Sequence, residues 1–166
     1  MNDTLMRALQ FLPDVRVRRL LENALRPMVD RYSTQALATA GLVIKAGASA
    51  LAKTGATAFH GIVKGKLVTI AASTDMPALV GSITAAYYNV FCFFIDEAST
   101  VTVAMGTEGA TRDAVKFPAF PENKALVGFL IVTYASAFTG GTTALDTATT
   151  QYVSPTGPID PAVLIG

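Results

Sequence analysis

The chain has 166 residues, about one domain, of which 51% are hydrophobic and 15% charged; its net charge is +1 and its mean hydropathy +0.44. One Cys and one His exclude an internal disulfide framework and a four-ligand Cys/His zinc site. High hydrophobicity with low charge excludes intrinsic disorder, and the small net charge provides no general attraction for nucleic acid.

Residues 3–31 are predicted to be helical, with Pro13 as the first residue of a second helix. Apolar side chains then recur at helical spacing: Val17, Leu20, Leu21, Ala24, Leu25 and Met28. The opposite face is polar: Arg16, Arg19, Asn23, Arg26 and Asp30. Glu22 stands four residues before Arg26, the favoured order for a helical ion pair, and Pro27 is expected to bend or end the helix. The pattern predicts an amphipathic helical arm with an Arg-rich outer face.

After Tyr32, Ala, Thr, Gly and Val dominate and short β-prone segments alternate with turn signals. The strand candidates are residues 42–44, 62–70, 87–95, 100–103, 115–120, 125–134 and 149–153. In the second candidate, Lys64 and Lys66 are placed on one face, opposite Leu67. Turns are predicted at residues 96–99 and at Gly140-Gly141. Residues 125–134 are apolar enough to be buried on both faces.

Short strands separated by Gly, Pro and Asp predict a mainly β fold, a β-sandwich or small barrel, with an N-terminal helical segment and an extended C-terminal tail. The predicted domain organisation is a helical arm at residues 1–32, a β-rich domain at 33–154 and a Pro-rich tail at 155–166. A linker is expected within residues 33–41.

The search for catalytic residues is mostly negative. Cys92 lies among phenylalanines, which favours a buried structural thiol, and His60 fits a loop or strand-end side chain better than a base. Asp96 and Glu97 are interpreted as solvated turn residues. No phosphate loop, serine-hydrolase elbow or calcium loop is present in the sequence. We therefore expect no catalytic residues, no metal and no cofactor, and a protein that is not an enzyme.

Residues 76–95 are uncharged over a length that spans a bilayer. Pro77, Gly81 and the acidic pair that follows oppose a membrane helix, and the aromatic second half favours a buried strand. We expect neither a membrane partner nor a nucleic-acid partner, because the arginines of the arm are few and interspersed with acids.

Charge is distributed unevenly along the chain. Residues 32–74 hold four lysines and no acid, whereas residues 75–124 are net acidic. Complementary segments of this kind suit head-to-tail contacts between copies of the chain.

Residues 117–129, with the motif Glu-Asn-Lys-Ala-Leu-Val-Gly, and residues 138–146, with Gly-Gly-Thr-Thr-Ala-Leu-Asp, resemble structural proteins of tailed-bacteriophage virions. The resemblance covers residues 85–155. It implies a homo-oligomeric capsid decoration or cement protein, most simply a trimer, that binds the major capsid protein or other virion proteins. It also implies a place on the capsid surface after synthesis in the host cytoplasm.

The low charge agrees with this class, because homo-oligomeric interfaces are apolar. The expected interface consists of Val17, Leu20, Leu21, Leu25 and Met28, with Arg16, Arg19 and Arg26 at its rim. The extended tail is suited to lie along a neighbouring copy or to add to its sheet edge. Three alternatives stay open: a tail, baseplate or head-fibre component, a membrane-associated protein, and an enzyme of unrecognised type.

Overall fold

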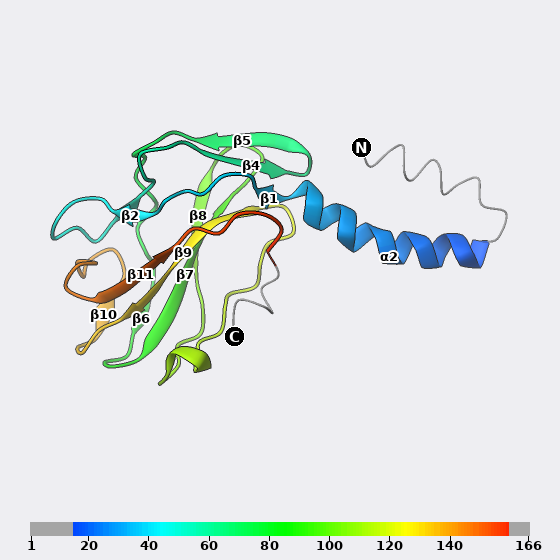
Figure 1. Ribbon diagram of the computed structural model, residues 1–166. Coiled ribbons are helices and arrows are strands. Elements are labelled where there is room, and N and C mark those ends of the chain that lie inside the picture. The colour runs from blue at the N-terminus through cyan, green and yellow to red at the C-terminus, as the bar shows by residue number, and fades with distance from the viewer. Residues whose placement is uncertain (1–14, 160–166) are drawn as a thin grey trace.

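The computed structural model describes residues 15–159, and these form one long helix followed by a body of short strands (Figure 1). The helix is α2 (Val15–Ser33). The strands are β1 (Gln35–Ala36), β2 (Val43–Ile44), β3 (Ala52–Lys53), β4 (Phe59–Val63), β5 (Lys66–Ile70), β6 (Ser82–Ile83), β7 (Tyr88–Ile95), β8 (Val101–Met105), β9 (Ala125–Thr133), β10 (Phe138–Thr139) and β11 (Thr149–Val153). A single 3₁₀ turn is described, at Arg112–Ala114. The mainly β fold with an N-terminal helical segment is therefore confirmed.

Two antiparallel sheets form most of the body. The larger has the strand order β11-β9-β7-β8 and the smaller the order β1-β4-β5. Two short ribbons, β10-β6 and β2-β3, extend one end of the body. The described strands close no barrel, so the fold consists of open sheets that share a core.

The central strand β7 is buried on both faces, which is why its sequence is a continuous apolar run. One face belongs to an inner core between the two sheets, which includes Phe59, Val63, Val68, Ile70, Phe91, Phe93, Ile95, Val127 and Leu130. The other face belongs to an outer core: Val90, Cys92, Phe94, Val115, Leu126 and Phe129. The neighbouring strand β9 contributes to both cores, as its sequence predicts.

The outer core is covered by an irregular segment, residues 107–120, rather than by a third sheet. Phe117 packs edge-on against Phe129, with ring centres 5.0 Å apart, and Phe120 packs against Phe94 at 5.2 Å. The prediction of a strand at residues 115–120 is wrong. The described pairing is a single bridge between Thr107 and Lys116, because Pro118 within the segment and Pro121 after it provide no N–H groups for a ladder.

The predicted strand 62–70 is a hairpin. Lys64 and Gly65 both have positive φ, 50° and 82°, and form the tight turn between β4 and β5. The turn reverses the chain, so Val63 lies in the inner core whereas Leu67 is 62% exposed. The predicted faces of this segment are therefore wrong.

Beyond β11 the chain leaves the larger sheet and joins the smaller one. The Leu42 N–H donates to the Ser154 hydroxyl at 2.9 Å. The Gly157 N–H donates to the Ala36 carbonyl oxygen at 2.7 Å, so residue 157 pairs with β1 on the side opposite β4. The expected linker at residues 33–41 is thus partly a sheet strand. The described part of the tail is packed on the body, and Ile159 contacts the outer core.

Candidate interaction surface

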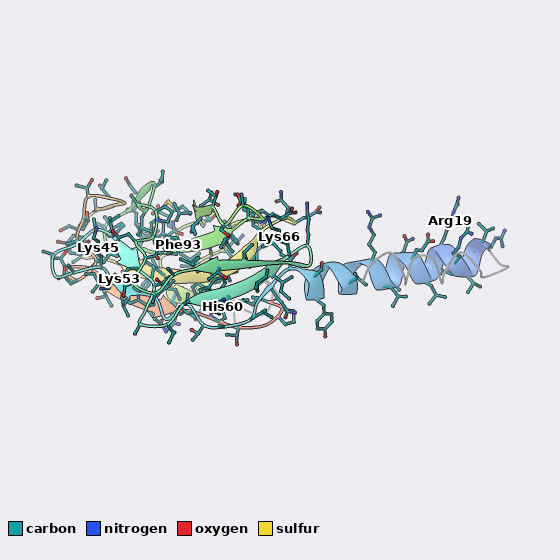
Figure 2. The ribbon with its side chains drawn as sticks, turned by 90° about the horizontal axis from the view of Figure 1, so that it is seen from above. Arg19, Lys45, Lys53, His60, Lys66 and Phe93 are labelled. Carbon is teal, nitrogen blue, oxygen red and sulfur yellow. The ribbon has the colours of Figure 1, made fainter. Side chains whose placement is uncertain are left out.

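Helix α2 projects from the body and is attached to it at its C-terminal end (Figures 1 and 2). The attachment is the β4–β5 turn, where the Lys64 N–H donates to the Thr34 hydroxyl at 3.1 Å. The helix does not end at Pro27 but continues to Ser33, so it reaches the body directly. Its predicted beginning, residues 3–14, lies outside the described part of the chain.

The apolar stripe of α2 is not covered by its own chain. Leu20 is 70% exposed, Val17 44% and Leu21 36%, whereas Leu130 and Leu145 of the body are buried almost completely. Leu25 is half-buried. The side chain of Met28 lies outside the described set. The predicted interface residues that are described therefore share one uncovered face of a helix.

The opposite face carries the predicted arginines. Arg16, Arg19 and Arg26 are exposed, and Figure 2 shows Arg19 near the far end of the helix, directed away from it. Glu22 pairs with Arg18, one turn before it, at 4.0 Å, rather than with Arg26 as the sequence suggested. An exposed pair of this kind contributes only about 0.3–0.5 kcal/mol, so this pair adds little to the stability of the helix.

A helix of this length and composition is marginal in water when isolated. Most helical stability in proteins comes from packing of the apolar face. Burying one Leu side chain fully contributes about 1.5–3 kcal/mol. The stripe of α2 therefore has more to gain from a partner than from any contact within the helix itself.

The four lysines of residues 32–74 do not form one patch. Lys45 and Lys53 lie at the end of the body far from α2, whereas Lys66 lies near α2 (Figure 2). Lys45 pairs with Asp75 at 2.6 Å, and Lys64 pairs with Glu97 at 3.5 Å. These two basic side chains find their acidic partners in the same chain, so they do not support a charge contact between copies.

The chemically reactive side chains are not brought together. Cys92 is fully buried in the outer core, as expected, and its burial raises the pKa of the thiol far above its ordinary range. His60 is exposed on the outer face of the smaller sheet, with Nδ1 3.1 Å from the Thr69 hydroxyl. Among residues 15–159, no group of three or more His, Cys, Asp or Glu side chains has the placement to hold a metal ion.

The acidic pair after β7 forms a turn, as predicted. Asp96 Oδ1 accepts hydrogen bonds from the backbone N–H groups of Ala98 and Thr100, both at 2.9 Å. Glu97 contacts the neighbouring sheet through Lys64 and through its carbonyl oxygen, which accepts a hydrogen bond from Lys66 Nζ at 2.8 Å. Asp96 therefore stabilises its own turn, and Glu97 joins this turn to the β4–β5 hairpin.

The uncharged stretch at residues 76–95 is a loop, the short strand β6 and the buried strand β7. No helix in the described part of the chain combines the length and hydropathy required to cross a membrane.

The fold and this surface define a β-rich body that carries an uncovered amphipathic helix. Comparison of the chain with protein-family models, with curated proteins and with solved structures finds no significant match.

Proposed function

We propose that the protein is a non-enzymatic structural component of a tailed-phage virion, a homo-oligomeric capsid decoration protein assembled through α2. The observation that carries the proposal is the exposure of Leu20, Val17 and Leu21 on a helix that its own body leaves uncovered. The resemblance of residues 85–155 to virion structural proteins supports the class. A second copy of the chain is the occupant of the stripe.

The spacing of the stripe suits a bundle of identical helices. Val17, Leu21 and Ala24 are separated by four and three residues, the alternation of a coiled-coil seam. Leu20 and Leu25 flank the seam and make it wider than the narrow stripe of a two-stranded coil. A wider stripe fits more than two helices, in agreement with a trimer.

The arginines fit the same arrangement, because they lie away from the seam. When the stripes of several copies meet, Arg16, Arg19 and Arg26 stay on the outside of the bundle. There the exposed guanidinium groups of Arg19 and Arg26 would form charge-assisted hydrogen bonds to carboxylates on the capsid protein. A protein that binds only the assembled shell stabilises it by mass action.

The oligomeric part of the proposal is tested by two substitutions that add the same charge to different faces of α2. Leu21→Glu places a carboxylate in the seam, whereas Asn23→Glu places one on the exposed polar face. Light scattering of the full chain is expected to give an oligomer for the wild type and N23E and a monomer for L21E. A monomeric wild type, or equal dissociation of both variants, contradicts assembly through the stripe.

The virion part is tested on purified particles produced from the genome that encodes the chain. Mass spectrometry is expected to detect the chain in the particles, and antibody labelling is expected to cover the whole head. Labelling at a single vertex would contradict the decoration role and support a tail, baseplate or head-fibre role. Particles that lack the chain would overturn the proposal.

A further inference from the structure

Strand β5 is an edge of the smaller sheet with backbone groups directed away from the protein. The strand order β1-β4-β5 leaves one side of β5 without a neighbouring strand, and β5 forms the upper margin of the body in Figure 1. Open edges of this kind are templates for pairing with another chain segment.

The register identifies which groups are directed outward. The His60 carbonyl oxygen is directed toward β1, where it accepts hydrogen bonds from the Leu37 and Ala38 N–H groups. Because the backbone groups of successive residues in a strand are directed to opposite sides, the N–H and C=O of Gly61 are directed toward β5. Gly61 is opposite Val68. Val68 therefore pairs with β4, and the N–H and C=O groups of Leu67 and Thr69 are directed to the open side.

The side chains along this edge leave room for a partner strand. Leu67 is 62% exposed, and Thr69 is exposed as well. Leu67 lies opposite Ile62 of β4, which is half-buried, so the two present an apolar pair on the outer face of the sheet. An added strand with apolar residues would cover this pair as well as the outward backbone groups.

The chain itself contains a segment of suitable length and chemistry. The described chain ends at Ile159, two residues after Gly157 joins β1, and residues 160–166 follow. Seven residues span about 23 Å when extended, enough to run along the five residues of β5. Residues 162–165, Ala-Val-Leu-Ile, are apolar and retain every backbone N–H, since the last proline is Pro161.

We propose that residues 162–165 of one copy add as a fourth strand to the β5 edge of a neighbouring copy. Gly157 pairs at the β1 edge, the opposite edge of the same three-stranded sheet, so the described part of the tail lies on the side away from its own β5. A contact from one edge to the other edge of the next copy is head-to-tail, and it closes into a ring when the copies are related by rotation. The inference rests on the proposed function in taking the partner strand from a second copy.

The test joins the two segments covalently in the full-length chain. Thr69→Cys places a thiol at the edge, and Val163→Cys and Leu164→Cys place one on either side of the tail, so that one of them is on the correct face whatever the register. When T69C protein is mixed with each tail variant under mild oxidation, one mixture is expected to yield a disulfide-linked product of twice the chain mass. Gln151→Cys, on the edge strand β11, is the control and is expected to yield no such product.

Four results overturn the inference. They are a disulfide that forms within one chain and not between chains when Thr69→Cys and a tail cysteine are placed in the same chain, a T69C homodimer in place of the mixed product, an equal yield with Q151C, and no link at all. Light scattering separates this failure from that of the proposed function. If the wild type is an oligomer that L21E dissociates, but no mixed disulfide forms, only the tail contact is contradicted. If the wild type is a monomer, assembly through α2 is contradicted as well.

Discussion

The backbone N–H of Gly65 donates a hydrogen bond of 2.8 Å to the carbonyl oxygen of Ser33, the last residue of α2. The last carbonyl groups of a helix have no partner within the helix, and here a turn of the sheet supplies one. The helix and the β4–β5 hairpin are thereby joined at the point where the arm meets the body.

Gly65 is expected to be sensitive to any side chain. Its φ of 82° disfavours other residues, although no atom lies within 4 Å of a Cβ built there. Gly65→Ala is therefore expected to lower the free energy of unfolding by about 1 kcal/mol through backbone strain alone. Gly65→Asn, which tolerates this conformation better, is expected to lose less in the same urea titration. Equal losses would contradict a conformational cause.

Gly128 is expected to be sensitive for a different reason, close packing. A Cβ at this position of β9 would lie 2.7 Å from the Val153 carbonyl oxygen and 2.6 Å from Leu42 Cδ1. Gly128→Ala forces these neighbours apart, and we expect a loss of about 1–3 kcal/mol in denaturant unfolding. Gly47→Ala, where a Cβ meets nothing within 4 Å, is the matched control and is expected to be near neutral. An unchanged free energy of unfolding for G128A would contradict close packing of Gly128 against Val153 and Leu42.

Glu108 is expected to make the stability of the protein depend on pH in acid. The Thr84 backbone N–H donates to Glu108 Oε2 at 2.8 Å, and the Thr84 hydroxyl donates to Oε1 at 2.7 Å. Both bonds lower the pKa of Glu108 below its ordinary 4.5, the backbone bond more than the hydroxyl bond. The contribution to stability is therefore fully present above the unfolded-state pKa and is lost as the pH falls through the lower folded-state pKa.

Glu108→Gln is expected to remove this part of the pH dependence, because the amide does not titrate. The measurement is the free energy of unfolding in urea from about pH 7 to about pH 3. Thr84→Ala removes the hydroxyl bond and keeps the backbone bond, so it is expected to flatten the acid limb only in part, and Thr142→Ala, at another exposed position, is expected to leave it unchanged. An unaltered limb in E108Q would contradict the role of this contact.

Cys92 is expected to be inert in the native state. Burial in the outer core raises the pKa of its thiol, so the reactive thiolate is scarce, and the surrounding side chains exclude reagents. A colourimetric disulfide reagent is expected to label Cys92 only as fast as the protein unfolds, and at once in denaturant. The exposed thiol of T69C provides the fast reference, and immediate labelling of native wild-type protein would contradict the packing described here.

The parts of the fold that the sequence predicts well are those where one pattern dominates. β7 and β9 are long apolar runs, and the turn between β7 and β8 begins with Asp96, whose side chain caps two backbone N–H groups. The hairpin at Lys64-Gly65 was missed, because alternating residues on both sides of the turn resemble one continuous strand. The signal present in the sequence is Gly65 between two lysines, because Gly favours a turn.

The candidate surface was predicted in part. Helical spacing identified the stripe that contains Leu20 and Leu21. Its exposure could not be predicted, since an amphipathic helix is equally suited to pack on its own domain. The pairing of Gly157 with Ala36 joins residues far apart in the sequence, and the free edge at Leu67 and Thr69 depends on strand order. Neither leaves a local pattern.

The same pairing determines how the molecule responds to a mechanical pull. β1 directly follows α2 and is held by β4 on one side and by Gly157 on the other. A force that draws the arm away from the body first loads the contacts of Ser33 and Thr34 with the β4–β5 turn and then acts on β1, whose hydrogen bonds involve both neighbours. The residues that follow the arm are thus anchored between β4 and the segment after β11, so tension on the arm is distributed to both sheets of the body.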